Sequence, residues 1–88
     1  MDFSYFCNST NWSNKPYEEI LNDARDIAQY IDQNHWNTIW FSEHHLQSTQ
    51  RGPMEVIPNP ILLSADIAAR TSNIRIGQAA SICTFWNP

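Results

Sequence analysis

Residues 36–46, WNTIWFSEHHL, decide how the rest of the chain is interpreted. The segment contains a short run rich in β-branched and aromatic side chains, Thr38 to Phe41, which is typical of a buried β-strand. Three ionisable residues follow almost at once, Glu43, His44 and His45. A buried strand does not simply continue through such side chains. We therefore predict that the strand ends here and that its carboxyl end carries a polar site, as the strands of a barrel do.

Signals for a strand and a helix precede this segment. An aromatic-rich run over residues 3–7 predicts a first strand, and the polar residues 8–14 end it. Pro16 suits a helix start because it lacks the amide hydrogen that would have no partner there. The helix is predicted to end near residues 33–35, where Asn or His can adopt a left-handed turn. One apolar stripe recurs at three- and four-residue steps along it, formed by Ile20, Leu21, Ala24, Ile27, Ala28 and Ile31.

A second helix and a third strand are predicted downstream. Residues 47–59 form a long polar loop, and loops of this length inside compact domains are usually functional or mobile. Asn59 is predicted to cap a helix whose first residue is Pro60. The packing face of that helix is predicted to consist of small and apolar residues, namely Ile61, Leu62, Ala65, Ala68 and Ala69. The last strand is predicted to cover residues 74–82.

The resulting β-α-β-α-β order predicts an α/β fold with a parallel sheet, right-handed crossovers and helices on one face. A doubly wound nucleotide-binding sheet is disfavoured, because the turn after the first strand is Asn-Ser-Thr-Asn and the whole chain has two glycines. A TIM (β/α)8 barrel places polar residues at the carboxyl ends of its strands and needs about 250 residues. We therefore expect residues 1–88 to be the amino-terminal part of an incomplete barrel.

Composition excludes several other classes. With 42% hydrophobic and 16% charged residues, the chain is expected to be one globular unit. Its net charge is -4 and its five basic residues are scattered, so neither nucleic acid nor a membrane surface is expected as a partner. The first residues lack the pattern of a signal peptide, from which we expect a cytoplasmic location. Cys7 and Cys83 are expected to be free, buried thiols.

Four motifs together resemble the amino-terminal part of the bacterial luciferase-like flavin-dependent monooxygenases. They are WFSEHHL from Trp40, PNPILL from Pro58, IAART from Ile67 and IRIGQAA from Ile74. The resemblance covers nearly the whole chain. It implies a (β/α)8 barrel that binds reduced FMN, or a deazaflavin in some branches, and that uses O2 to oxidise an organic substrate. It also implies a flavin reductase as the source of reduced flavin and a dimer at full length. Further flavin-binding segments of the family lie beyond Pro88, so the chain alone is expected to be inactive.

The same resemblance assigns roles to the ionisable residues. His44 is expected to manage protons beside the flavin, because an imidazole accepts protons near neutral pH. Adjacent strand residues point to opposite sides, so only one of His44 and His45 is expected to reach the pocket. Glu43 and His45 are expected to be supports, with Glu43 fixing the tautomer of an imidazole. In the alternative interpretation, His44 and His45 only cap the strand end, and Glu43 is a solvent-facing or salt-bridged acid.

Ala79 and Ala80 form the second predicted part of the site. The resemblance implies that this small pair lies against the flavin ring and is joined by a cis non-proline peptide, whereas the alternative is ordinary tight packing. No metal site is predicted, because the ionisable residues at positions 43–45 are consecutive and lack the i, i+4 histidine pair of a helical zinc motif.

Three functions stay open. The first is a luciferase-like monooxygenase that uses reduced FMN and O2. The second is a non-catalytic flavin-binding relative, or a barrel remnant with a structural or assembly role. The third is a deazaflavin-dependent oxidoreductase of the same family.

Overall fold

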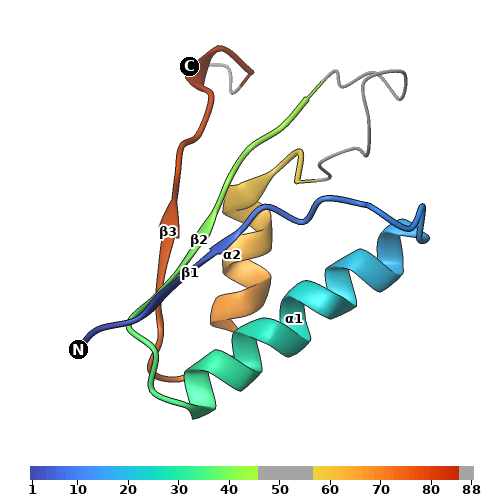
Figure 1. Ribbon diagram of the computed structural model, residues 1–88. Helices are drawn as coiled ribbons and strands as arrows, with labels where there is room; N and C mark the ends of the chain where they lie inside the picture. Colours follow the sequence, from blue (N-terminus) through green and yellow to red (C-terminus); the bar gives the residue numbers. More distant parts are fainter. Residues whose placement is uncertain (46–56, 86–88) are drawn as a thin grey trace.

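The computed structural model describes residues 1–45 and 57–85, and its elements follow the order predicted from the sequence (Figure 1). Leu46 and most of the predicted loop at residues 47–59 lie outside the described residues. The elements are β1 (Ser4–Cys7), α1 (Tyr17–Gln33), β2 (Thr38–Phe41), α2 (Pro60–Ala68), β3 (Arg75–Gln78) and the short 3-10 helix η2 (Cys83–Phe85). The three strands form one parallel sheet in the order β1-β2-β3, which confirms the predicted α/β arrangement.

The register of the sheet brings the carboxyl ends of the strands to one edge (Figure 1). The last paired row consists of Cys7, Phe41 and Gln78. One residue further along each strand are Asn8, Ser42 and Ala79. The hydroxyl of Ser42 donates to Oδ1 of Asn8 at 2.7 Å, and the backbone N–H of Ala79 donates to the carbonyl of Phe41 at 2.8 Å. These bonds hold the three strand ends side by side.

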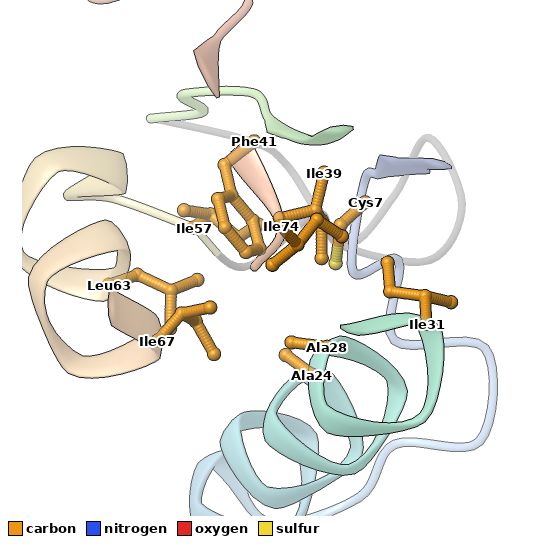
Figure 2. Packing of buried hydrophobic residues seen from close by; sticks show 10 residues of the cluster. All are labelled: Cys7, Ala24, Ala28, Ile31, Ile39, Phe41, Ile57, Leu63, Ile67 and Ile74. Atoms are coloured by element: carbon orange, nitrogen blue, oxygen red, sulfur yellow. The ribbon is translucent and has the colours of Figure 1, made fainter. Parts of the chain in front are cut away.

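Both helices cover the same face of the sheet (Figure 1). Figure 2 shows how side chains from the strands meet those of α1 and α2 in a single core, which comprises Cys7, Ala24, Ala28, Ile31, Ile39, Phe41, Ile57, Leu63, Ile67 and Ile74. Strand side chains that alternate with these point away from the helices: Phe6 is 53% exposed and Trp40 is 39% exposed. The sheet therefore has one face covered by helices and one open face.

The first helix has the predicted buried stripe. It buries Ile20, Ala24, Ala28 and Ile31, while Leu21 and Ile27 are partly buried. The helix ends at Gln33, and His35 then adopts a left-handed conformation with φ of 59°. The N–H of Trp36 closes the turn by donating to the carbonyl of Ile31 at 3.0 Å. The prediction that an Asn or His ends this helix is confirmed.

The second helix begins as predicted but packs through a different face. The side chain of Asn59 accepts the N–H of Leu62 at 2.9 Å, and Pro60 is the first helical residue. The residues that face the core are Pro60, Leu63 and Ile67. The predicted face is wrong, since its members are exposed: Ile61, Leu62, Ala65, Ala68 and Ala69. Apolar residues occur on nearly every side of α2, so periodicity did not identify its buried face.

The third strand is shorter than predicted. It ends at Gln78 rather than at Ile82. Strand pairing needs a partner, and β2 itself ends at Phe41, so the last ladder bond is the one from Ala79 to Phe41. Beyond it the chain leaves the sheet and forms η2.

The carboxylate of Asp32, near the end of α1, determines where β3 begins. It accepts backbone N–H groups from Ser72 at 3.1 Å, Asn73 at 2.8 Å and Ile74 at 2.7 Å. Burial raises the pKa of the Asp32 carboxyl, but the three hydrogen bonds outweigh this effect, so its pKa is lowered below the usual value. The ionised carboxylate is therefore part of the folded structure.

Replacing Asp32 with Ala is expected to destabilise the fold. The Asp32→Ala variant leaves three backbone donors without their acceptor, and we expect the free energy of unfolding at pH 7 to fall by about 2–3 kcal/mol. Urea denaturation of the full chain measures this loss. Asp26→Ala, which removes an exposed carboxylate from the same helix, is the matched control and should change stability much less.

The pH dependence of stability distinguishes the charge of Asp32 from the packing of its side chain. Because the pKa of Asp32 is lowered on folding, its stabilisation is present above about pH 4, where an unfolded Asp is ionised, and is lost as the pH falls through the pKa in the folded state. The difference between wild type and Asp32→Ala should therefore shrink on acidification. An equal difference at pH 7 and at pH 2 would contradict the role of the ionised carboxylate.

Candidate functional site

The carboxyl edge of the sheet brings together the two segments that the sequence singled out. Residues 42–45 follow β2, and residues 79–82 follow β3. The N–H of Ile82 donates to Oε2 of Glu43 at 2.7 Å, which joins the two segments. The N–H of Ala79 donates to the carbonyl of Phe41, the last residue of β2, at 2.8 Å. Segments about 40 positions apart in the sequence thus lie next to each other.

Glu43 is buried at this junction. Its side chain is 0% exposed, so the interpretation as a solvent-facing acid is wrong. Oε1 lies 2.6 Å from Nε2 of His45, and Oε2 accepts the N–H of Ile82. Since a buried carboxylate is costly unless its oxygens are bonded, these contacts define the position of the side chain closely.

The imidazole of His45 lies between a carboxylate and an aromatic ring. Besides contacting Glu43, it stacks on Phe85 of η2, with ring centroids 4.2 Å apart and planes inclined by 22°. Because a carboxylate accepts a hydrogen bond, its contact favours the tautomer of His45 that carries the proton on Nε2. His45 therefore connects the end of β2 with η2.

His44 is held through its backbone. Its N–H donates to the carbonyl of Ile57 at 3.0 Å, which ties the end of β2 to the segment that leads into α2. The side chain of His44 is partly buried. The side chain of His45 contacts Glu43 and Phe85, and which of the two histidines reaches the pocket stays a prediction.

Ala79 and Ala80 are both exposed. Their side chains therefore do not serve the tight core packing considered as the alternative. The peptide bond between them is cis, as the resemblance implied. The pair presents two methyl groups beside the end of β2, which gives this edge a small apolar surface next to ionisable residues.

The open face below this edge has a contact that the sequence did not reveal. The indole of Trp40 lies directly on Gly77, and a Cβ atom at Gly77 would overlap with ring carbons Cε3 and Cζ3 of Trp40. Glycine is therefore needed for this close approach. The signal was present in the IRIG motif, but its meaning depends on the register that pairs Trp40 with Gly77.

A separate cavity of about 310 Å³ lies on the helix side of the sheet, between β1, the following loop and α1. None of the predicted site residues lines it. Cys7 does, and burial raises the pKa of its thiol, only partly offset by hydrogen bonding to Ser9. Cys83, by contrast, is exposed, so the prediction that both thiols are buried is wrong for this residue.

Residues 1–45 and 57–85 contain neither a metal-binding cluster nor a membrane-spanning helix. No group of three or more His, Cys, Asp or Glu side chains there is arranged to hold a metal ion. Among the helices of the same residues, none has both the length and the apolar character needed to cross a membrane.

Known proteins resemble the chain over most or all of its length. Residues 1–88 match the luciferase-like monooxygenase family. The oxygenase component of the flavin-dependent trigonelline monooxygenase of Acinetobacter baylyi is 30% identical over 89 residues, which cover 100% of this chain and 23% of that protein. An uncharacterised protein of Sinorhizobium fredii is 29% identical over 69 residues, or 78% of this chain and 18% of its own length.

Solved structures show the same fold. The crystal structure of apo-MsnO8 superposes with a TM-score of 0.83 at 24% identity and covers 97% of this chain, which corresponds to 24% of that one. The oxygenating constituent of 3,6-diketocamphane monooxygenase from Pseudomonas putida, a type II Baeyer-Villiger monooxygenase solved with FMN, gives a TM-score of 0.79 at 25% identity, covering 91% of this chain and 21% of that one.

These matches connect the β-α-β-α-β unit to a larger barrel. The structural neighbours are TIM-barrel luciferase-like monooxygenases, which confirms the predicted fold class. The chain spans less than a quarter of the length of the A. baylyi oxygenase component. With a match over all 88 residues, the chain belongs to the luciferase-like monooxygenase family.

Proposed function

We propose that residues 1–88 form the amino-terminal part of a monooxygenase that uses reduced FMN and O2 to oxidise an organic substrate. The observation that carries the proposal is the junction of residues 42–45 with the exposed Ala79-Ala80 pair. The junction lies at the carboxyl edge of a parallel sheet, where (β/α)8 enzymes have their active sites. The chain supplies one wall of the site, and we expect it to be inactive alone.

The residues at this edge fit an isoalloxazine ring. The methyl groups of Ala79 and Ala80 offer an exposed apolar surface without bulk, and His44 and the buried Glu43-His45 pair lie in the adjoining segment. FMN is favoured over a deazaflavin, because one relative is named as flavin-dependent and another was solved with FMN. When bound, reduced flavin would supply the electrons that activate oxygen.

Within this proposal, His44 is the proton-handling residue. The contacts of His45 with Glu43 and Phe85 give that imidazole a supporting position. His44 is attached to the same strand end by its backbone, and a neutral imidazole there accepts a proton from a reacting group and returns it. Glu43 holds the neighbouring ring and does not itself exchange protons with the substrate, since its side chain is fully buried.

The partners follow from the same proposal. A separate flavin reductase is the source of reduced FMN, which is supported by the name of the A. baylyi relative as an oxygenase component. A cytoplasmic location is also part of the proposal, as is a dimer at full length, which the resemblance to the family implies. A measurement of turnover distinguishes the enzyme from the non-catalytic alternative, which is a flavin-binding relative or barrel remnant.

FMN binding tests the cofactor assignment. We define the completed barrel as residues 1–88 in place of the matched 89-residue segment of the A. baylyi oxygenase component. In anaerobic titrations it should bind reduced FMN with a Kd in the micromolar range, and the 88-residue chain should bind at least about tenfold more weakly, because it offers only one wall. A folded completed barrel that binds no FMN would contradict the proposal, whereas micromolar binding by the short chain would contradict the one-wall interpretation.

Turnover tests the role of His44. In the completed barrel, with reduced FMN and trigonelline, His44→Ala is expected to lower kcat by about 100-fold, because general acid-base groups contribute that much or more. The Kd for FMN should change far less. The control is His35→Asn, which keeps a residue tolerant of the left-handed turn at the opposite edge and should leave kcat unchanged. Equal losses of turnover and FMN affinity in His44→Ala would indicate that His44 has a structural role. A wild-type completed barrel that binds FMN but has no turnover would favour the non-catalytic alternative.

A further inference from the structure

We propose that Glu43 is a positioning residue: its buried carboxylate holds the segment after β3 so that Ala79 and Ala80 face the flavin. Flavin affinity then depends on a side chain that does not touch the flavin. This inference rests on the proposed function and concerns the same site.

The segment after β3 is attached to the end of β2 at two points. At its start, the N–H of Ala79 donates to the carbonyl of Phe41 at 2.8 Å. Three residues later, the N–H of Ile82 donates to Oε2 of Glu43 at 2.7 Å. Between these points the chain is no longer paired as a strand, and Ala80 is exposed. The two anchors therefore determine where the alanine pair lies relative to β2.

A second connection runs through the other carboxylate oxygen. Oε1 of Glu43 contacts Nε2 of His45 at 2.6 Å, and the His45 ring stacks on Phe85 at 4.2 Å between centroids. Phe85 belongs to η2, which directly follows the alanine segment. Glu43 thus acts on both ends of the stretch from Ile82 to Phe85, once through a backbone amide and once through an imidazole.

The burial of Glu43 shows that it acts through these partners. A carboxylate that is 0% exposed and bonded through both oxygens to protein groups is not placed to meet a substrate or a flavin. Ionised groups are buried at considerable cost and are retained where they fix a particular arrangement. The arrangement fixed here is the approach of residues 79–82 to the end of β2.

Two substitutions break the contact from opposite sides. Glu43→Leu keeps a similar size and removes both acceptor oxygens, so the N–H of Ile82 and Nε2 of His45 both lose their acceptor. Ile82→Pro removes the donor from the opposite side and leaves the carboxylate intact. If the two substitutions act by breaking the bond between Glu43 and Ile82, their effects on FMN affinity should not be additive.

The test has a first arm without flavin. Hydrogen exchange of backbone amides in the full chain, followed by NMR, should show the Ile82 amide protected in wild type and exchanging about tenfold faster in Glu43→Leu. The amide of Arg75, which donates to Asn37 at the other edge, should keep its protection. Glu19→Leu, an exposed substitution in α1, is the matched control. Unchanged protection of Ile82 in Glu43→Leu would overturn the proposed anchor.

The second arm uses the completed barrel. Glu43→Leu and Ile82→Pro should each raise the Kd for reduced FMN by about tenfold, and the Kd of the double variant should be close to that of the weaker-binding single variant. At saturating FMN, kcat should fall much less than it does in His44→Ala. Loss of Ile82 protection without a change in FMN affinity would overturn the positioning role and leave the proposed function intact. Absence of FMN binding by the wild-type completed barrel would overturn the proposed function, and this inference with it.

Discussion

The three hydrogen bonds that Asp32 accepts from residues 72–74 determine where β3 starts, and the position of the candidate site follows from that starting point. Side chains alternate along a strand, so a shift of one residue would move every side chain of β3 to the other face. In the observed register Thr38 pairs with Arg75, which places Gly77 under Trp40 and Ala79 one step beyond the last paired row. A buried carboxylate at the amino edge thus sets the geometry of the carboxyl edge.

The same strand is held at its other end by a second buried carboxylate. Glu43 accepts the N–H of Ile82, as Asp32 accepts those that precede β3. The two acids come from different elements and serve different purposes: Asp32 stabilises the connection between α2 and β3, whereas Glu43 places a segment that has already left the sheet. This division agrees with the general arrangement of (β/α)8 proteins, in which the amino edge serves stability and the carboxyl edge serves function.

Features that depend on local sequence were predictable, and features that depend on distant contacts were not. The buried stripe of α1 and the Asn59 cap of α2 follow from spacing and from the chemistry of single residues, and both are present. The buried face of α2 was predicted wrongly, because nearly all of its sides are apolar and only tertiary packing distinguishes them. The end of β3 was missed, because it is set by where β2 ends. Glu43 accepts a hydrogen bond from the backbone N–H of Ile82, which follows β3. Every residue except proline has such a donor, so the sequence does not indicate which one Glu43 contacts.

We propose that the ends of β2 and β3 form one wall of a flavin pocket. A crystal structure of the completed barrel soaked with FMN tests this most directly. The isoalloxazine ring should contact Ala79 and Ala80, His44 should lie beside the ring, and Glu43 should keep its bond to the N–H of Ile82. A ring bound elsewhere, for example in the cavity between β1 and α1, with the alanine pair still exposed, would contradict it.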